Sequence, residues 1–162
     1  MHISFSIEGE KQLSRNLTTL DWNLKNWYTE FLATGKYLQN FFAGPVFSSR
    51  GGVIGEGWKP LSPAYAAQKA KRYPGRGILE ATGKMRGSFQ YEASSMWTRV
   101  FNTTSYFKYH QSRMPRSRLP RRIMMKLAET EKRKIVQIFH KGLDNYIRKS
   151  GFRLKTGFSP TL

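Results

Sequence analysis

Residues 13–41, LSRNLTTLDWNLKNWYTEFLATGKYLQNF, decide the fold because their apolar positions recur at alternating steps of four and three. This spacing keeps one stripe of side chains on one side of an α-helix. It predicts a helix over residues 10–43, roughly 50 Å long at 1.5 Å per residue. Gly44 and Pro45 end the helix, because proline cannot continue its hydrogen bonding. Gly35 is the expected position of a kink. The stripe consists of Leu13, Leu17, Leu20, Leu24, Trp27, Phe31, Thr34, Leu38 and Phe41.

Two partners remain open for this stripe. It packs either on the protein's own sheet or on a second helix in a coiled coil, which uses the same spacing. Charged residues are sparse along the helix, and this favours the protein's own sheet. Trp22, Tyr28 and Phe42 lie off the stripe, so we expect these extra aromatic side chains to contact a neighbouring subunit.

Short elements and turns make up the rest of the chain. Residues 3–7 alternate apolar and polar side chains, which predicts a short strand. Five glycines within residues 44–57 predict a long flexible loop rather than a helix or strand. Its GGVIGEG segment lacks the Gly-Lys-Ser/Thr ending of a phosphate-binding loop. The other predicted elements are helices at 64–72, 78–88 and 123–150, strands at 89–92 and 97–101, and a helical turn at 106–111.

The order of these elements predicts an α+β fold, in which a small antiparallel sheet is packed by two long helices. The 162 residues suffice for one domain with a real core. We expect that domain over residues 1–150 and a C-terminal tail over residues 151–162. No secretory signal is evident at the N-terminus, and no apolar run is long enough to span a membrane.

The charge of +18 is concentrated in one part of the chain. Residues 1–61 carry six Lys and Arg against five Asp and Glu, whereas residues 62–162 carry 22 against five. Self-repulsion of this size indicates a polyanionic neighbour or an acidic partner surface. The charge alone leaves both DNA and an acidic protein open.

The sequence offers no constellation for catalysis. Cysteine is absent, which excludes disulfides and thiolate metal sites. His2, His110 and His140 lie far apart, and none has a second histidine or a glutamate at the spacing of a metal motif. His110 lies among aromatic residues and is interpreted as a hydrogen-bonded packing residue. We therefore predict that the protein is not an enzyme and has no catalytic, cofactor or metal site.

The strongest local signal is the arginine-rich segment at residues 113–122. Arginine suits phosphates and bidentate carboxylate pairing, and the prolines of the segment stiffen it. The segment is therefore predicted to bind either DNA phosphates or an acidic protein ring. Its arginines are Arg113, Arg116, Arg118, Arg121 and Arg122.

Three motifs occur in an order that resembles the phage virion morphogenesis family. The first is Trp58-Lys59-Pro60-Leu61-Ser62, before a basic helix that contains Lys69. The second, ILEATGKMRGS at residues 78–88, is similar to the family pattern I-L-x-x-T-G-x-L-x-x-S, with Met85 in place of leucine. The third, YFKYHQ at residues 106–111, resembles Y-A-x-x-H-Q. Pro120-Arg121-Arg122 occupies the place of the family's Pro-x-Arg element. The sequence departs from the family pattern at Ser112, Ile123 and Met124.

The resemblance implies a structural subunit of a tailed-phage virion, made in the host cytoplasm. Such a subunit joins a ring, expected to be six-fold, at the head-proximal end of the tail, where it completes the tail or joins it to the head. Its partners would be its own copies and acidic surfaces of other neck and tail proteins. The resemblance also leaves non-specific contact with genome DNA open, and it implies no membrane partner. A non-specific DNA-binding protein is the alternative function. The motif residues expected to act as scaffolding are Trp58, Pro60, Leu61, Leu79, Gly83, His110, Gln111 and Pro120.

Overall fold

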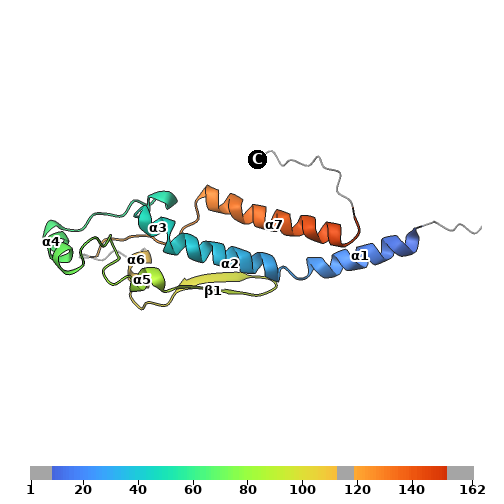
Figure 1. The fold of residues 1–162 in the computed structure, drawn as a ribbon, viewed down its shortest axis with the longest axis horizontal. Helices are drawn as coiled ribbons and strands as arrows, with labels where there is room; N and C mark the ends of the chain where they lie inside the picture. Colours follow the sequence, from blue (N-terminus) through green and yellow to red (C-terminus); the bar gives the residue numbers. More distant parts are fainter. Residues whose placement is uncertain (1–8, 113–118, 153–162) are drawn as a thin grey trace, which may run out of the picture.

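The computed structural model describes residues 9–112 and 119–152. The molecule is elongated, with α1 at one end, α4 at the other and α2 in the middle (Figure 1). The predicted strand at residues 3–7 lies outside the described residues, as does the tail beyond residue 152. In chain order the elements are α1 (Glu10–Leu24), α2 (Tyr28–Ala43), α3 (Pro45–Ser48), the 3-10 helix η1 (Gly52–Ile54), α4 (Pro63–Arg72), α5 (Lys84–Gly87), β1 (Phe89–Ala93), β2 (Thr98–Asn102), α6 (Phe107–Gln111) and α7 (Glu129–Lys149).

The α+β architecture is confirmed, with one antiparallel hairpin as the sheet among the described residues. β1 pairs with β2 from Phe89 opposite Asn102 to Ala93 opposite Thr98. One side of α2 packs on this hairpin and another on α7, so α2 lies between the two (Figure 1). α7 packs against α2 and α1. Of the two long helices, α2 is therefore the one that covers the sheet.

The long N-terminal helix is two helices, because the chain breaks between Leu24 and Tyr28. At the break, the Trp27 indole Nε1 donates a 2.8 Å hydrogen bond to the Leu24 carbonyl. The Trp27 backbone N–H donates a 3.1 Å bond to Ser95 in the hairpin turn. The Trp27 ring also packs on Phe139 of α7. Contacts of Trp27 with Ser95 and Phe139, which are distant in the sequence, thus stabilise the break between the two helices. The apolar stripe nevertheless continues through the break.

Gly35 does not kink the helix, contrary to the sequence prediction. It lies inside α2, where a Cβ atom would come within 2.6 Å of Thr98 Oγ1 and Tyr91 Cδ2. The glycine therefore lets α2 approach the hairpin closely, which a larger residue would prevent.

The prediction that residues 44–57 contain no helix is wrong, since α3 and η1 lie within them. Val46, Phe47 and Ile54 of this segment are among the most buried side chains of the core. Gly51 has φ +80°, and its N–H donates a 2.8 Å bond to the Val46 carbonyl. The glycines permit tight turns that bring three apolar side chains inward, so the segment is ordered by its own subunit.

The C-terminal helix begins at Glu129, six residues later than predicted. Residues 123–128 are irregular because Met124 is fully buried and side chains bind the backbone beside it. The predicted helix at residues 78–88 is likewise reduced to α5, and Leu79 has φ +64°. The start of α4 after Ser62, the hairpin and the helical turn α6 agree closely with the sequence predictions.

The core is centred on aromatic side chains from α2, α3, β1 and α6. The Phe89 ring lies 6.1 Å from Phe42, 6.2 Å from Phe47 and 5.7 Å from Phe107, measured between ring centroids. Phe42 is 3% exposed, so it cannot contact a neighbouring subunit as predicted. Phe42 lies off the apolar stripe, but α3 and the hairpin also cover its side of α2.

Candidate functional site

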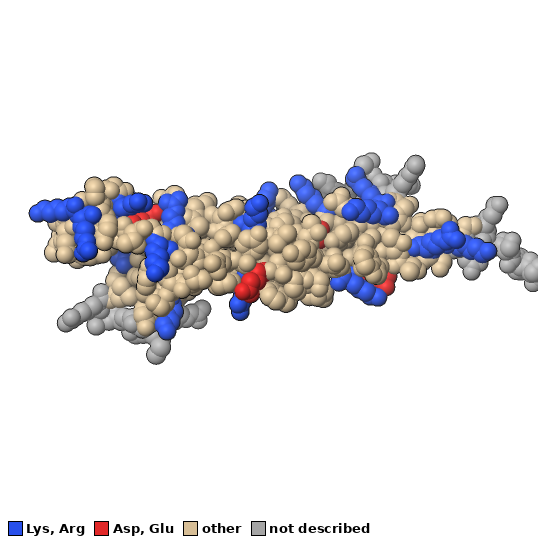
Figure 2. All heavy atoms as spheres, turned by 60° about the horizontal axis from the view of Figure 1, so that its bottom comes forward, with Lys and Arg blue, Asp and Glu red and all other residues tan. Residues whose placement is uncertain are grey.

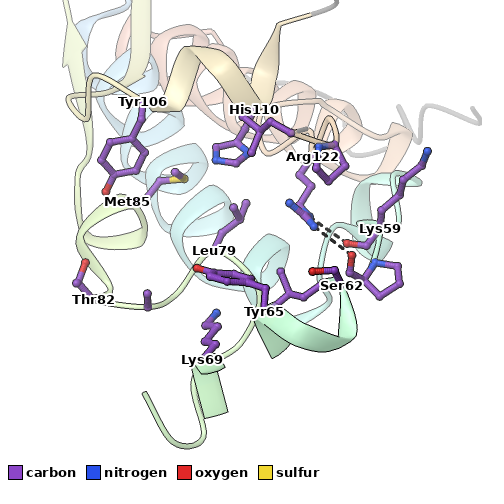
Figure 3. A pocket seen from close by; sticks show the side chains of 15 residues that line it. Lys59, Ser62, Tyr65, Lys69, Leu79, Thr82, Met85, Tyr106, His110 and Arg122 are labelled. Carbon is purple, nitrogen blue, oxygen red and sulfur yellow. Dashed lines mark hydrogen bonds between the residues drawn. The ribbon is translucent and has the colours of Figure 1, made fainter. Parts of the chain in front are cut away.

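The motif segments, which are far apart in the sequence, meet around one pocket of about 840 Å³ (Figure 3). The segment after Trp58, the turn before α5, helix α6 and the chain before residue 123 each form part of its wall. Motif residues on that wall are Pro60, Leu61, Leu79, Met85, His110 and Pro120.

Arg122 connects two of these segments. Its Nε donates a 3.0 Å hydrogen bond to the Lys59 carbonyl, and its Nη2 donates a 3.3 Å bond to the Pro60 carbonyl (Figure 3). The residue is 4% exposed, and burial lowers the pKa of its guanidinium. Arg122 is therefore not an exposed arginine of the 113–122 segment: its head group bonds backbone carbonyls of its own subunit on the pocket wall.

Trp58 connects the first motif to the chain segment that follows Arg122. Its indole Nε1 donates a 2.6 Å hydrogen bond to the Ile123 carbonyl. The ring meets Phe47 edge-on at 5.3 Å between centroids. Trp58 thereby joins the end of the glycine-rich segment to the core and to the chain that follows Arg122.

The Gln111 side chain forms hydrogen bonds with the backbone of the irregular segment at residues 123–128. Its Oε1 accepts bonds of 3.0 Å from the Met124 N–H and 3.2 Å from the Met125 N–H. Its Nε2 donates a 2.8 Å bond to the Met125 carbonyl. One side-chain amide thus replaces a strand partner, which explains how this segment is buried without regular structure.

His110 is buried on the pocket wall, and among the described residues its Nδ1 has no hydrogen-bond partner. Burial lowers the pKa of its imidazole, and the positive charge of Arg122 lowers it further. The ring is therefore held in the neutral form near pH 7. The expectation of a hydrogen-bonded packing histidine is correct for the packing, but Nδ1 lacks the expected bond.

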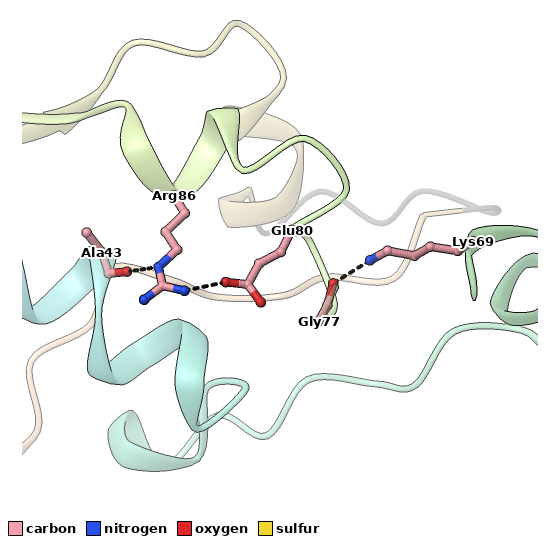
Figure 4. A network of polar contacts seen from close by, with 5 residues as sticks. All are labelled: Ala43, Lys69, Gly77, Glu80 and Arg86. Carbon is pink, nitrogen blue, oxygen red and sulfur yellow. Dashed lines mark hydrogen bonds and ion pairs between the residues drawn. The ribbon is translucent and has the colours of Figure 1, made fainter. Parts of the chain in front are cut away.

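The second motif is held by polar contacts to α2 and α4 (Figure 4). Arg86 Nη1 pairs with Glu80 Oε1 at 2.7 Å, and Arg86 Nε donates a 2.7 Å bond to the Ala43 carbonyl at the end of α2. Lys69 Nζ donates to the Gly77 carbonyl. Gly83, with φ +74°, is the residue before α5, a conformation that favours glycine.

The remaining predicted interface residues are distributed over the surface. Trp22 and Tyr28 are exposed on either side of the joint between α1 and α2, and Arg121 is exposed beside the buried Arg122. Arg113, Arg116 and Arg118 lie outside the described residues. Among the described residues, Arg121 and the two exposed aromatics therefore do not form one site.

Sequence reasoning missed that Lys69 is buried on the pocket wall. Leu61, Tyr65 and Lys69 line the pocket at steps of four, and this spacing was the available signal. Of the residues that the structure describes, no Asp or Glu lines the pocket. Among the described residues, no group of three or more His, Cys, Asp or Glu could hold a metal ion.

These features define a small, basic α+β protein whose motif residues tie loops together around a pocket. Residues 12–144 match the phage virion morphogenesis family, and the chain therefore belongs to that family. Membership in this family points to a structural or assembly role in a bacteriophage virion. No curated protein and no solved structure matches the chain. No helix within the described ranges has both the length and the apolar character to cross a membrane.

Proposed function

We propose that this protein is a subunit of a ring at the head-proximal end of a phage tail, where it completes the tail or prepares it for joining to the head. The observation that carries the proposal is the apolar surface of α1, which the described part of the subunit leaves exposed. The family match supplies the virion context.

Helix α1 turns a largely polar face toward its own subunit. Asn16, Leu20 and Asn23 are its partly buried positions, and the Asn23 amide donates a 3.4 Å hydrogen bond to Ser150 Oγ after α7. By contrast, Leu13 and Leu17 are each 51% exposed and Leu24 is 38% exposed. These three leucines share one side of the helix because they are spaced by four and seven residues.

The leucine side of α1 therefore suits a second copy of the chain. Burying a fully exposed leucine contributes roughly 1.5–3 kcal/mol, so covering the exposed parts of these three side chains favours association by a smaller sum. At the joint beside α1, further apolar side chains are exposed. The Trp27–Ser95 hydrogen bond brings the hairpin turn to this joint. The exposed residues here are Trp22, Tyr28, Met96 and Trp97.

The difference between the two ends of the subunit supports a ring. An arm at one end that binds a different surface of the next copy makes head-to-tail contacts, which close into a ring when the rotation permits. We propose six copies on the strength of the family resemblance. Lysines and arginines lie along the whole length of the face in Figure 2, and few acidic side chains are visible among them. We infer that they dock on acidic surfaces of neck and tail proteins; non-specific DNA binding is the alternative that this charge supports.

Sedimentation velocity across a concentration series tests the self-association. We expect the wild-type chain to form a closed oligomer, and Leu13→Gln, Leu17→Gln and Leu24→Gln together to leave it monomeric. Ser14→Gln and Thr18→Gln on a neighbouring side of α1, with Lys25→Gln directly after the helix, change exposed residues and form the matched control. A wild-type protein that stays monomeric, or an unchanged oligomer in the leucine variant, would show that α1 is not the assembly surface.

A further inference from the structure

Two buried cations, Lys69 and Arg122, lie on the wall of the pocket without an acidic counter-ion among the described residues. Lys69 is 6% exposed and Arg122 is 4% exposed. The hydrogen bonds of both go to backbone carbonyls, those of Gly77, Lys59 and Pro60. The Glu80 carboxylate, which acts on Lys69 at longer range, forms its 2.7 Å ion pair with Arg86 instead. Within the described part of the chain, neither cation has an ion pair with a carboxylate.

Burying a charge without an opposite charge is unfavourable unless a partner supplies one. Burial indeed lowers the pKa of the Lys69 ammonium, with Glu80 opposing that change. The two cations come from different motif segments, one on α4 and one before α7. The fold therefore holds them beside the same cavity at a cost in stability.

Much of the remaining pocket wall is apolar. Leu61, Leu79, Met85 and Leu119 line it, and Tyr65 adds an aromatic ring (Figure 3). A volume of about 840 Å³ lies within the range of sites that enclose ligands or short peptide segments. An occupant that complements these walls carries both an apolar side chain and a negative charge.

We propose that this pocket binds an acidic peptide segment of another virion protein, with a carboxylate facing Arg122 and Lys69 and an apolar side chain against Leu79 and Met85. The inference rests on the proposed structural function and names the chemistry of one partner. A peptide fits better than DNA because both cations are recessed. The phosphates of a duplex lie on its outside, and they would meet exposed side chains instead.

Ser62 offers a change that tests the pocket while preserving the fold. It lines the pocket and precedes α4, and its side chain makes no capping hydrogen bond. Ser62→Asp keeps a residue that favours this position, and it adds a negative charge to the wall. Ser62→Asn is the matched control, with nearly the same shape and capping preference but no charge.

The probe is a series of short synthetic peptides in which Glu progressively replaces Gln around a single Phe or Leu, measured by fluorescence polarisation. We expect affinity to rise with the number of Glu residues and with the apolar residue present. We expect Ser62→Asp to weaken the most acidic peptide about tenfold or more and Ser62→Asn to change it by less than about twofold.

Two results would overturn the pocket assignment. One is that no acidic peptide binds more tightly than its Gln counterpart. The other is that duplex DNA, in the same assay, loses affinity through Ser62→Asp while the acidic peptides do not. The sedimentation experiment on α1 does not involve the pocket, so either proposal can fail while the other stands.

Discussion

The hydroxyl of Tyr146 on α7 donates a 2.7 Å hydrogen bond to Oε2 of Glu30 on α2. Glu30 is buried. Desolvation of the Tyr146 hydroxyl raises the pKa of Tyr146 to about 12, and the hydrogen bond to Glu30 adds to this increase. Gly142, one helical turn before Tyr146, leaves the space that the Glu30 side chain fills. The hydrogen bond between Tyr146 and Glu30 thus joins α2 to α7, and the lack of a side chain at Gly142 gives the Glu30 carboxylate its space.

Gly142→Ala should destabilise the protein by about 1–3 kcal/mol, because its methyl group would overlap the Glu30 carboxylate. Gly87→Ala is the matched control: Gly87 ends α5, and a Cβ there meets nothing within 4 Å. The control should be neutral or slightly stabilising, by at most about 1 kcal/mol. Urea unfolding measures both. Equal stability of the two variants would mean that α2 and α7 are not packed at Gly142.

Arg122→Gln and Arg121→Gln should differ sharply although the residues are neighbours. The first change removes hydrogen bonds from a buried guanidinium to two carbonyls, and we expect a loss of about 2–4 kcal/mol. The second changes an exposed side chain and should stay within about 0.5 kcal/mol. Thermal and urea unfolding report both values. Wild-type stability of Arg122→Gln would contradict its structural role.

The pH dependence of stability should contain a contribution from His110. Its pKa is below the ordinary 6.5 in the folded protein, so the unfolded chain binds the proton more readily. The free energy of unfolding therefore falls as pH is lowered through 6.5, by at most about 1.4 kcal/mol per pH unit, until the folded pKa is reached. His110→Gln should lose this part of the dependence, whereas His140→Gln, which changes an exposed residue, serves as the control. Identical pH profiles for wild type and His110→Gln would refute the prediction.

Residues 44–57 should be protected from amide hydrogen exchange in the isolated subunit. The N–H groups of Gly51 and Glu56 donate backbone hydrogen bonds of 2.8 and 3.0 Å within the segment, and the Trp58 N–H, directly after it, donates a 2.9 Å bond to the Arg50 carbonyl. Hydrogen-exchange mass spectrometry should therefore find similar protection before and after assembly. Exchange as fast as in an unstructured peptide, with protection only in the particle, would favour ordering by neighbouring subunits instead.

Elements with local signals could be predicted from the sequence, whereas features set by distant contacts could not. Ser62-Pro63 marks the start of α4, and the alternation after Phe89 gives the hairpin. The break before Tyr28 was hidden because Trp27 continues the apolar stripe while its partners, Ser95 and Phe139, are distant in sequence. Glycine count suggested a loop at residues 44–57, although three apolar side chains there enter the core.

The site shows the same division. The motifs identified residues of the pocket wall, such as Leu79 and His110, but not that they meet there. Arg121 and Arg122 are adjacent residues of the same type, so the sequence does not distinguish them. Only Arg122 is buried, where its guanidinium donates hydrogen bonds to the carbonyls of Lys59 and Pro60. The exposure of Trp22 and Tyr28 followed from their place off the stripe, whereas Phe42 is covered by elements that come later in the chain.

Locating the chain in purified virions tests the central claim most directly. A label fused to the protein, imaged by electron microscopy on intact particles, should appear at the head-proximal end of the tail. The leucine variant of α1 should be missing from that position, and its heads and tails should remain unjoined. A labelled wild-type chain that is abundant in infected-cell lysate but absent from purified particles would contradict the structural role.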